Sequence, residues 1–291
     1  MFDTFQLEMI DLPGATLRVR HGGSGSPVLL LHGHPRTHAT WHRVAPLLAE
    51  EYTVVCPDLR GFGKSSKPAD TPDHAGSSKR AKANDCVALM ERLGYDRFVV
   101  IGHDRGAYVA TRLTLDHPER VSKLVVLDAV PILEALERCD EKFARMWWHW
   151  FFFAQPEKPE QAILADPDTW YSSAEQAEQM DSEAYQDYLA AIRSPETVHG
   201  MVEDYRAGLG IDRAHDVADR AAGRRITCPT LVGWSLKDDL ENLYGDVLAV
   251  WQPWAVDLQG FSLNCGHHMA EEMPEDLAAA LLEFLRKPPT R

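Results

Sequence analysis

Short apolar runs alternate with amphipathic stretches along most of the chain. Apolar runs that end in glycine or polar residues predict buried strands. These runs are Val28–Leu31, Tyr52–Cys56, Phe98–Gly102, Ser122–Leu127, Thr230–Trp234 and Trp254–Leu258. Weaker alternation on either side of Pro13-Gly14 predicts a hairpin that pairs Thr4–Ile10 with Ala15–His21.

Helical spacing fills the intervals between these runs. Lys79–Leu93 carries apolar residues at a helical period, and Gly94 then ends the helix. Further helices are predicted at Trp41–Glu50, from Arg105 to about His117, and at Pro274–Arg286. Strands that alternate with helices predict an α/β fold with a mostly parallel sheet and helices on both of its faces.

The pattern changes between the two halves of this α/β region. Residues 130–225 are rich in helix formers, aromatic and acidic residues, and contain no convincing strand. We therefore predict a core formed by residues 1–129 and 226–291, with residues 130–225 inserted as a helical lid.

The run Val99–Ile101 ends in Gly102-His103-Asp104-Arg105-Gly106. Glycines on both sides of Asp104 let the strand and the following helix approach around a strained turn. This strand–turn–helix pattern resembles the nucleophile elbow of the α/β-hydrolases, with Asp in place of Ser. An Asp at the apex predicts a carboxylate nucleophile that forms an alkyl-ester intermediate. The alternative is an Asp that only caps the helix.

The remaining members of a nucleophile–acid–base set follow in the α/β-hydrolase order. Asp128 ends a predicted strand, and His267 follows Gly266 in a loop. His267 would activate water and Asp128 would orient it. Asp238 and Asp239 are alternatives for the acid, and His268 is the alternative for the base. In α/β-hydrolases the His32-Gly33-His34 turn supplies a backbone N–H to the oxyanion hole, so we expect the N–H groups of His34 and Arg105 to serve there.

Composition limits the partners of this site. The chain has 291 residues and a formal net charge of −14, which disfavours nucleic acid and anionic membranes. Its five scattered cysteines lack metal-binding spacing and suit a reduced cytoplasm. No secretory signal or transmembrane run is visible, so we expect a cytoplasmic protein. We expect no metal and no cofactor, and a homodimer is one of the assemblies open to the chain.

Three motifs resemble the haloacetate (fluoroacetate) dehalogenases, and the resemblance runs over nearly the whole chain. They are Gly102-His103-Asp104-Arg105-Gly106, Trp148-His149-Trp150 and Asp204-Tyr205-Arg206-Ala207-Gly208. The resemblance implies that Asp104 is the nucleophile, with Asp128 and His267 as acid and base. It also implies that Arg105 binds the substrate carboxylate, and that His149, Trp150 and Tyr205 donate to the departing halide. The implied substrate is a small, anionic 2-haloacid.

One position departs from this family. A second carboxylate-binding Arg is expected three residues after Arg105, but the chain has Tyr108 there. Tyrosine can donate one hydrogen bond and carries no charge. Arg112 lies one turn further along the helix. The two-arginine clamp is therefore broken, and Tyr108 could serve a larger haloacid or a neutral substrate.

Two other functions remain open. An epoxide hydrolase uses the same nucleophile with two lid tyrosines, for which Tyr205 and one of Tyr171, Tyr185 or Tyr188 are candidates. A non-catalytic ligand-binding protein on the same fold is the second alternative. The lid aromatics could also form nothing more than an apolar packing face.

Overall fold

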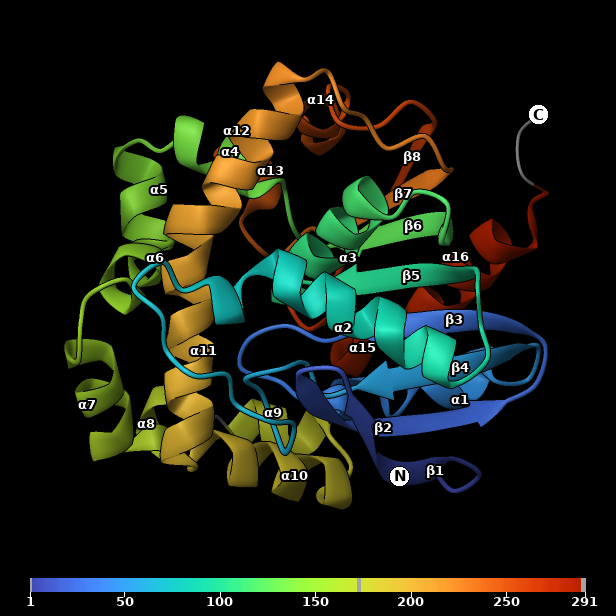
Figure 1. The fold of residues 1–291 in the computed structure, drawn as a ribbon, viewed down its shortest axis with the longest axis horizontal. Helices are drawn as coiled ribbons and strands as arrows, with labels where there is room; N and C mark the ends of the chain where they lie inside the picture. Colours follow the sequence, from blue (N-terminus) through green and yellow to red (C-terminus); the bar gives the residue numbers. More distant parts are fainter. Residues whose placement is uncertain (1, 172–173, 289–291) are drawn as a thin grey trace.

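The computed structural model describes residues 2–171 and 174–288, and its strands form one eight-stranded sheet (Figure 1). The strand order across the sheet is β1-β2-β4-β3-β5-β6-β7-β8. The strands are β1 (Gln6–Leu12), β2 (Ala15–Gly23), β3 (Ser26–Leu31), β4 (Tyr52–Pro57), β5 (Phe98–His103), β6 (Val121–Leu127), β7 (Thr230–Ser235) and β8 (Leu258–Leu263).

Parallel pairing brings the functional loops to one edge of the sheet. β1 pairs antiparallel with β2, and β2 antiparallel with β4, whereas every pairing from β4 through β3 and β5 to β8 is parallel. Because parallel strands share a carboxyl edge, the loops after β3, β5, β6, β7 and β8 meet there. This sheet confirms the predicted α/β fold class.

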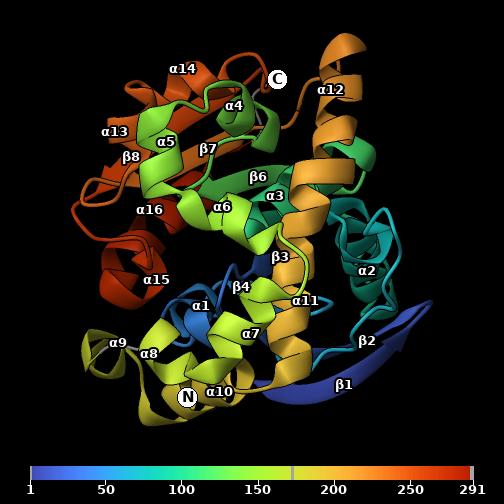
Figure 2. The same cartoon turned by 90° about the vertical axis from the view of Figure 1, so that its left-hand side faces the viewer.

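Helices cover both faces of the sheet, as Figures 1 and 2 show. α2 (Lys79–Arg92) and α3 (Arg105–Asp116) pack together on one face, and α1 (Val44–Leu48) lies with α16 (Pro274–Arg286) on the other. In strand β3, alternate residues point to opposite faces of the sheet. Leu29 and Leu31 belong to the apolar cluster under α2 and α3, whereas Val28 and Leu30 join the cluster under α1 and α16.

The connection from β6 to β7 consists, in its described residues, of helices joined by loops, with one isolated bridge at Ile226, and we call its helices the lid helices. They are α4 (Ile132–Glu137), α5 (Glu141–Met146), α6 (Trp148–Phe153), α7 (Lys158–Ala165), α8 (Pro167–Tyr171), α9 (Ala174–Gln179), α10 (Ser182–Ile192), α11 (Pro195–Ala207) and α12 (Arg213–Ala221). A π-helical turn, Gly208–Asp212, joins α11 to α12. The division into core and lid domains stays a prediction, and residues 1, 172–173 and 289–291 within its limits lie outside the described part.

Short helices complete the chain. They are the 3-10 turns His38–Trp41 and Ala75–Ser77, and the helices α13 (Leu240–Tyr244), α14 (Val247–Trp251) and α15 (Met269–Glu272). The predicted helix Trp41–Glu50 is therefore shorter, because α1 covers only Val44–Leu48 and a 3-10 turn precedes it.

The predicted last strand was wrong. Trp254–Leu258 is not a strand, and β8 begins at Leu258. Trp254 is buried, and its Nε1 donates to Glu134 Oε1 at 2.8 Å. Residue 255 makes only an isolated bridge with Ile226. Because β8 is an edge strand with partly exposed residues, its sequence is less apolar than that of the segment before it.

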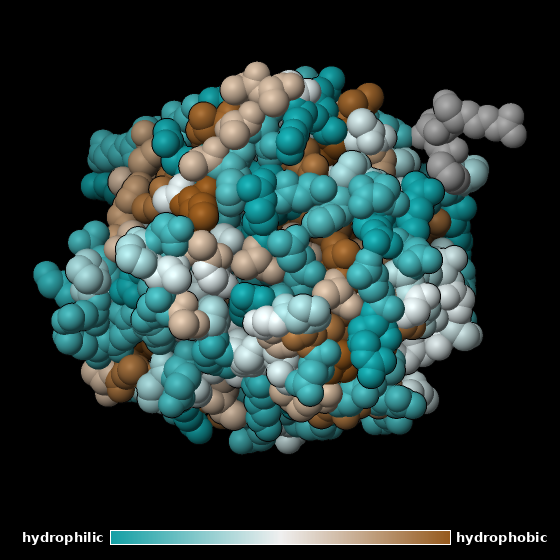
Figure 3. All heavy atoms as spheres, in the orientation of Figure 1, coloured by the Kyte–Doolittle hydropathy of each residue, from teal (hydrophilic) through white to brown (hydrophobic). Residues whose placement is uncertain are grey.

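The face of the molecule seen in Figure 3 is largely hydrophilic, with apolar residues in scattered small groups. Within the described residues, no helix combines the length and the apolar character needed to cross a membrane.

Candidate active site

Asp104 occupies a sharp turn between β5 and α3. Its backbone has φ +51°, a conformation that costs free energy in a non-glycine residue. Glycine makes the turn possible, because a Cβ at Gly102 would lie 2.3 Å from the carbonyl oxygen of Gly106. A Cβ at Gly33 would lie 2.3 Å from Asp104 Oδ1. The loop after β3 can therefore approach the Asp104 carboxylate only because position 33 has no side chain.

The two oxygens of Asp104 have different surroundings. Oδ1 accepts a hydrogen bond from the backbone N–H of His34 at 2.6 Å, and Oδ2 lies 3.8 Å from His267 Nε2. Burial raises the pKa of Asp104, but the nearby His267, His103 and Arg105 outweigh burial and lower it below its ordinary value. Asp104 is therefore an ionised carboxylate with one oxygen held by the backbone.

His267 sits between two acidic residues. Its Nδ1 lies 2.8 Å from Asp128 Oδ2 and 2.8 Å from Asp238 Oδ2. Burial lowers the pKa of His267, but its hydrogen bonds to the two carboxylates raise it well above its ordinary value. His103 Nε2 donates to the carbonyl oxygen of His267 at 2.7 Å and fixes the loop. The sequence treated Asp128 and Asp238 as alternatives, and the structure brings both to the same nitrogen.

These residues open into a cavity of about 250 Å³ under the lid helices. It is lined by His34, Pro35, Asp104, Tyr108, Asp128, Met146, Trp147, His149, Trp150, Tyr205, Asp238, Asp239, His267 and His268. His149, Trp150 and Tyr205 thus share one space with Asp104, although they come from α6 and α11. Within the described part of the chain, the side chains of these three residues make no hydrogen bond with other protein groups. Their donors are available to a substrate.

Aromatic packing positions the donors. The rings of Trp147 and Trp150 stack at 5.2 Å between centroids and an interplanar angle of 15°. Tyr205 meets Phe153 edge to face at 4.9 Å and His149 at 5.7 Å. Burial lowers the pKa of His149 to about 4, so its imidazole is neutral at physiological pH.

Arg105 lies behind the cavity wall and is not among the described residues that line the cavity. Its Nε donates to Asp204 Oδ2 at 2.6 Å, and its guanidinium carbon lies 4.1 Å from the centre of the Tyr205 ring. Lys79 and Lys82 also bind Asp204, and Lys79 lies 3.3 Å from Asp212. Three cations thus face two carboxylates, which leaves one positive charge in this buried cluster.

The Arg105 guanidinium keeps one donor unused. Its Nη1 is buried and has no hydrogen-bond partner. Gly208 makes room for the side chain, since a Cβ there would lie 2.8 Å from Arg105 Nη2. Gly208 begins the π-helical turn after α11, and such turns recur at functional sites.

Tyr108 takes the place of a second arginine at the cavity wall. Its ring lies 6.1 Å from that of Trp150 and 5.0 Å from the guanidinium carbon of Arg105. Arg112 cannot replace the missing charge, because it binds Asp216 and Asp219 in α12. Among the described residues, neither an arginine nor a lysine lines the cavity itself.

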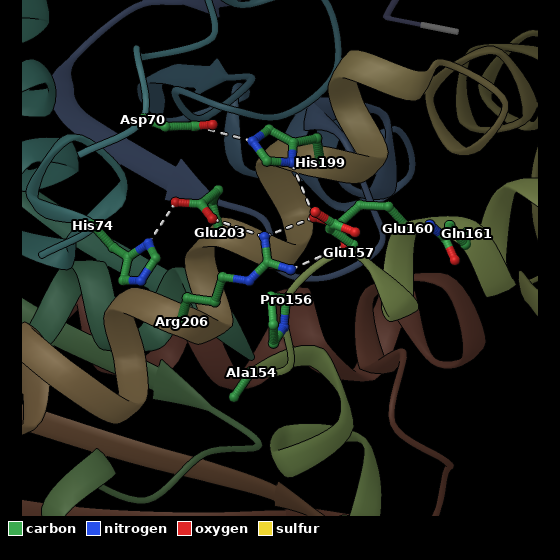
Figure 4. A pocket seen from close by; sticks show the side chains of 10 residues that line it. All are labelled: Asp70, His74, Ala154, Pro156, Glu157, Glu160, Gln161, His199, Glu203 and Arg206. Atoms are coloured by element: carbon green, nitrogen blue, oxygen red, sulfur yellow. Dashed lines mark hydrogen bonds and ion pairs between the residues drawn. The ribbon is translucent and has the colours of Figure 1, made fainter. Parts of the chain in front are cut away.

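A second, larger cavity of about 670 Å³ lies on another face of α11 (Figure 4). Here the polar side chains bind one another: His199 contacts Asp70 at 2.9 Å and Glu160 at 3.0 Å. His74 binds Glu203, and Arg206 bridges Glu203 and Glu160. Asp70, His199 and Glu203 lie close enough to hold a cation, but Arg206 already supplies positive charge there. We place the chemistry in the smaller cavity.

Comparison with known proteins shows which family the chain belongs to. Residues 26–240 match the family model of the alpha/beta hydrolase fold. The chain belongs to the α/β-hydrolase family. It is 44% identical to a fluoroacetate dehalogenase from Burkholderia sp., over 98% of this chain and 95% of that protein. It is 32% identical to a soluble epoxide hydrolase from Corynebacterium sp. (strain C12), over 90% and 91% of the two chains.

One solved structure has the same fold over almost the full length of both chains. A protein from Nostoc sp. PCC 7120, provisionally described as an alpha/beta hydrolase, has a TM-score of 0.95 at 43% identity, with 99% of this chain and 100% of that chain covered. The resemblance to fluoroacetate dehalogenases is thus confirmed, and this α/β hydrolase is an enzyme by family.

The sequence-based predictions did not include some residues that line the cavity, and they offered other residues that do not line it. Trp147 and Met146 line the cavity, whereas Trp148, from the quoted motif, is 49% exposed. Their helical spacing relative to Trp150 could have shown this. Tyr171, Tyr185 and Tyr188, which were candidates to pair with Tyr205, do not line the cavity with Asp104. Tyr108 is the second tyrosine there.

Proposed function

We propose that this α/β hydrolase is a hydrolytic dehalogenase that cleaves the carbon–halogen bond of a small 2-haloacid, such as haloacetate or fluoroacetate. Asp104 would displace the halide and form an alkyl ester, which water then opens to give a 2-hydroxy acid. The proposal rests above all on the unpaired, neutral donors of His149, Trp150 and Tyr205, which share a small cavity with an ionised carboxylate.

The first step needs a nucleophile and a place for negative charge. Oδ1 of Asp104 accepts from the backbone N–H of His34, so Oδ2 would be the oxygen that attacks the carbon as the carbon–halogen bond breaks. The bonding electrons leave with the halide. Donors on His149, Trp150 and Tyr205 would stabilise this charge most in the transition state, when it develops. A cavity of about 250 Å³ suits a substrate of few atoms.

The substrate carboxylate would bind towards Arg105, which lies behind the cavity wall against the rings of Tyr205, Trp150 and Tyr108. Arg105 Nη1 is the buried, unpartnered donor there, and the cluster around Asp204 keeps one positive charge. Charge-assisted hydrogen bonds to an arginine suit a carboxylate. The Tyr108 hydroxyl would supply the second donor, without charge, so we propose a weaker clamp than two arginines would give.

The second step opens the ester. Water between His267 Nε2 and the ester carbonyl would lose a proton to His267 and attack Cγ of Asp104. The resulting oxyanion on Oδ1 would be held by the backbone N–H of His34, which already donates at 2.6 Å, and by that of Arg105. Collapse of this intermediate would release the hydroxy acid and restore the carboxylate.

Epoxide hydrolysis is the second candidate. The same Asp104 could open an epoxide, provided that an acid protonates the leaving oxygen. Tyr205 and Tyr108 both line the cavity and carry hydroxyl donors, and His149 lies beside Tyr205. The 32% identity to the epoxide hydrolase from Corynebacterium is consistent with this alternative.

A substrate panel distinguishes the two. We expect halide release from fluoro-, chloro- and bromoacetate or from 2-halopropionates, and little diol from a simple epoxide. Trapping of labelled substrate on Asp104 would accompany either activity and would exclude a protein that only binds its ligand. Rapid diol formation with no halide release would overturn the dehalogenase proposal in favour of epoxide hydrolysis.

A further inference from the structure

Two carboxylates compete for one hydrogen on His267. The imidazole Nδ1 carries a single proton, yet Asp128 Oδ2 and Asp238 Oδ2 both lie at 2.8 Å from it. Like charges at such close range repel strongly when buried. The arrangement becomes favourable when one carboxyl group keeps a proton, because the pair then carries one negative charge.

We propose that Asp238 is a second positioning residue for His267, and that Asp128 and Asp238 together retain one proton at neutral pH. The ring would then be oriented by two oxygens while it faces the charge of one carboxylate. With one of the two carboxyl groups un-ionised, only one negative charge raises the pKa of His267, so that its Nε2 can lose its proton and act as the base. The proposal uses the ester hydrolysis of the proposed function only for its kinetic test.

The two carboxyl groups differ in burial and in partners. The Asp128 side chain is fully buried, and its Oδ1 accepts from the backbone N–H of Ser235 at 3.0 Å. Its φ of +52° is a second strained non-glycine conformation at this edge of the sheet. The Asp238 side chain is 26% exposed and reaches His267 from the loop after β7. The buried group is the one for which ionisation costs more.

The pKa directions agree with this assignment. Burial, together with the charge of Asp238, raises the pKa of Asp128 to about 7, although the hydrogen bond from His267 acts against the rise. For Asp238, burial is outweighed by the hydrogen bond and charge of His267, which lower its pKa to about 2. Asp128 is therefore the carboxyl group that holds the shared proton and loses it only as the pH rises through about 7, whereas Asp238 is already ionised there.

The other titratable groups around His267 do not take over this role. They are Asp104 at 3.8 Å from Nε2, His103 and His268 at ring distances of 4.7 and 5.2 Å, and Asp239 in the cavity wall. Burial lowers the pKa of His103 to about 4 and that of His268 well below its ordinary value, so both rings are neutral. Asp239 binds Trp147 Nε1 instead of the imidazole.

Infrared difference spectra of the free enzyme test the shared proton without a substrate. The un-ionised carboxyl band of Asp128 should titrate near pH 7 in the wild type. In Asp238→Asn its midpoint should fall by about two or more pH units, since one neighbouring negative charge is gone. Asp128→Asn should remove the band, and Asp239→Asn, the matched control, should keep it. An unchanged midpoint in Asp238→Asn would overturn the shared proton.

Single-turnover hydrolysis of the Asp104 ester tests the positioning role. Loss of the acid in a nucleophile–histidine–acid triad costs about 10⁴-fold in rate. If both carboxylates position His267, each single Asn variant should lose only about 10-fold, and the double variant should approach the full loss. An Asp128→Asn variant as slow as the double would show that Asp238 does not act on His267. If no ester formed in any variant, the proposed function would fail, while the infrared result would stand.

Discussion

Helix α11 separates two cavities that differ in how their polar groups are satisfied. In the larger one, the side chains of His199, Glu203 and Arg206 are paired with one another or with Asp70, His74 and Glu160, so that its polar groups have partners within the protein. In the smaller one, Tyr205 and its neighbours on α6 leave their donors free beside Asp104.

This difference shows why size does not identify a catalytic site. A buried donor without a partner is costly, and folding leaves such groups where a ligand will use them. Backbone strain does not separate the two cavities, since a positive φ occurs at Asp104 and Asp128 beside the smaller one and at His74 and Glu157 beside the larger one. If this comparison holds, substitutions in the smaller cavity should change the chemistry, and substitutions in the larger one should affect only the contact between the lid helices and the core.

Replacement of Asp104, the proposed nucleophile, should have the largest effect. We expect Asp104→Ala to abolish halide release while the protein stays folded, because no other carboxylate lies at the elbow. Steady-state halide release and circular dichroism measure the two properties. Halide release near the wild-type rate would show that another group attacks the substrate.

Replacement of His267, the proposed base, should separate the two steps. In His267→Asn we expect one equivalent of halide and then a persistent ester on Asp104, because water lacks its base. Intact-mass spectrometry after addition of haloacetate measures the adduct. Multiple turnovers without an adduct would remove His267 from this role.

Loss of one proposed hydrogen-bond donor to the halide should slow only the first step, in which the halide leaves. We expect Tyr205→Phe to slow the halide burst by about 10- to 100-fold, because one hydrogen bond to the developing charge is lost. The matched control is Tyr185→Phe, which removes a hydroxyl from a tyrosine outside the cavity and should keep the wild-type burst. Equal rates for both variants would contradict the halide-binding role of Tyr205.

A positive charge at position 108 should strengthen the proposed binding of the substrate carboxylate. We expect Tyr108→Arg to raise kcat/KM for haloacetate by up to about 10-fold, since one charge-assisted contact is worth about 1.5–3 kcal/mol and the nearby Asp239 will take part of it. Tyr108→Phe, the control, should lower kcat/KM for haloacetate. A harmful Tyr108→Arg together with an unaffected Tyr108→Phe would indicate that residue 108 shapes a pocket for a different substrate.

The larger cavity should give the smallest effect. We expect His199→Ala to leave kcat/KM within about twofold of wild type, and to lower the free energy of unfolding by at most about 1 kcal/mol, because its ion pairs are partly exposed. Halide release and chemical denaturation measure these. A loss of activity as large as in Tyr205→Phe would move part of the function to this face of α11.

The core part of the site could be predicted from sequence because its residues follow local rules. Asp104 lies between glycines at a strand–helix turn, and Asp128 and His267 follow strands whose carboxyl ends share one edge. An apolar run fixes the strand, and the parallel sheet then fixes where the next polar residue lies. The apolar runs also predicted the fold class correctly. They misplaced only the last strand, because β8 is an edge strand and its apolar pattern is weaker.

The lid part needed the tertiary structure. A spacing of three residues groups Trp147 with Trp150, but only the packing of the lid helices on the core decides that this pair lines the cavity while Trp148 stays exposed. Sequence also could not reveal that Asp204 binds Arg105 behind the wall, or that Asp128 and Asp238 converge on one nitrogen. These contacts join residues far apart in the chain, so they are decided only when the sheet, the loops and the lid helices have packed together.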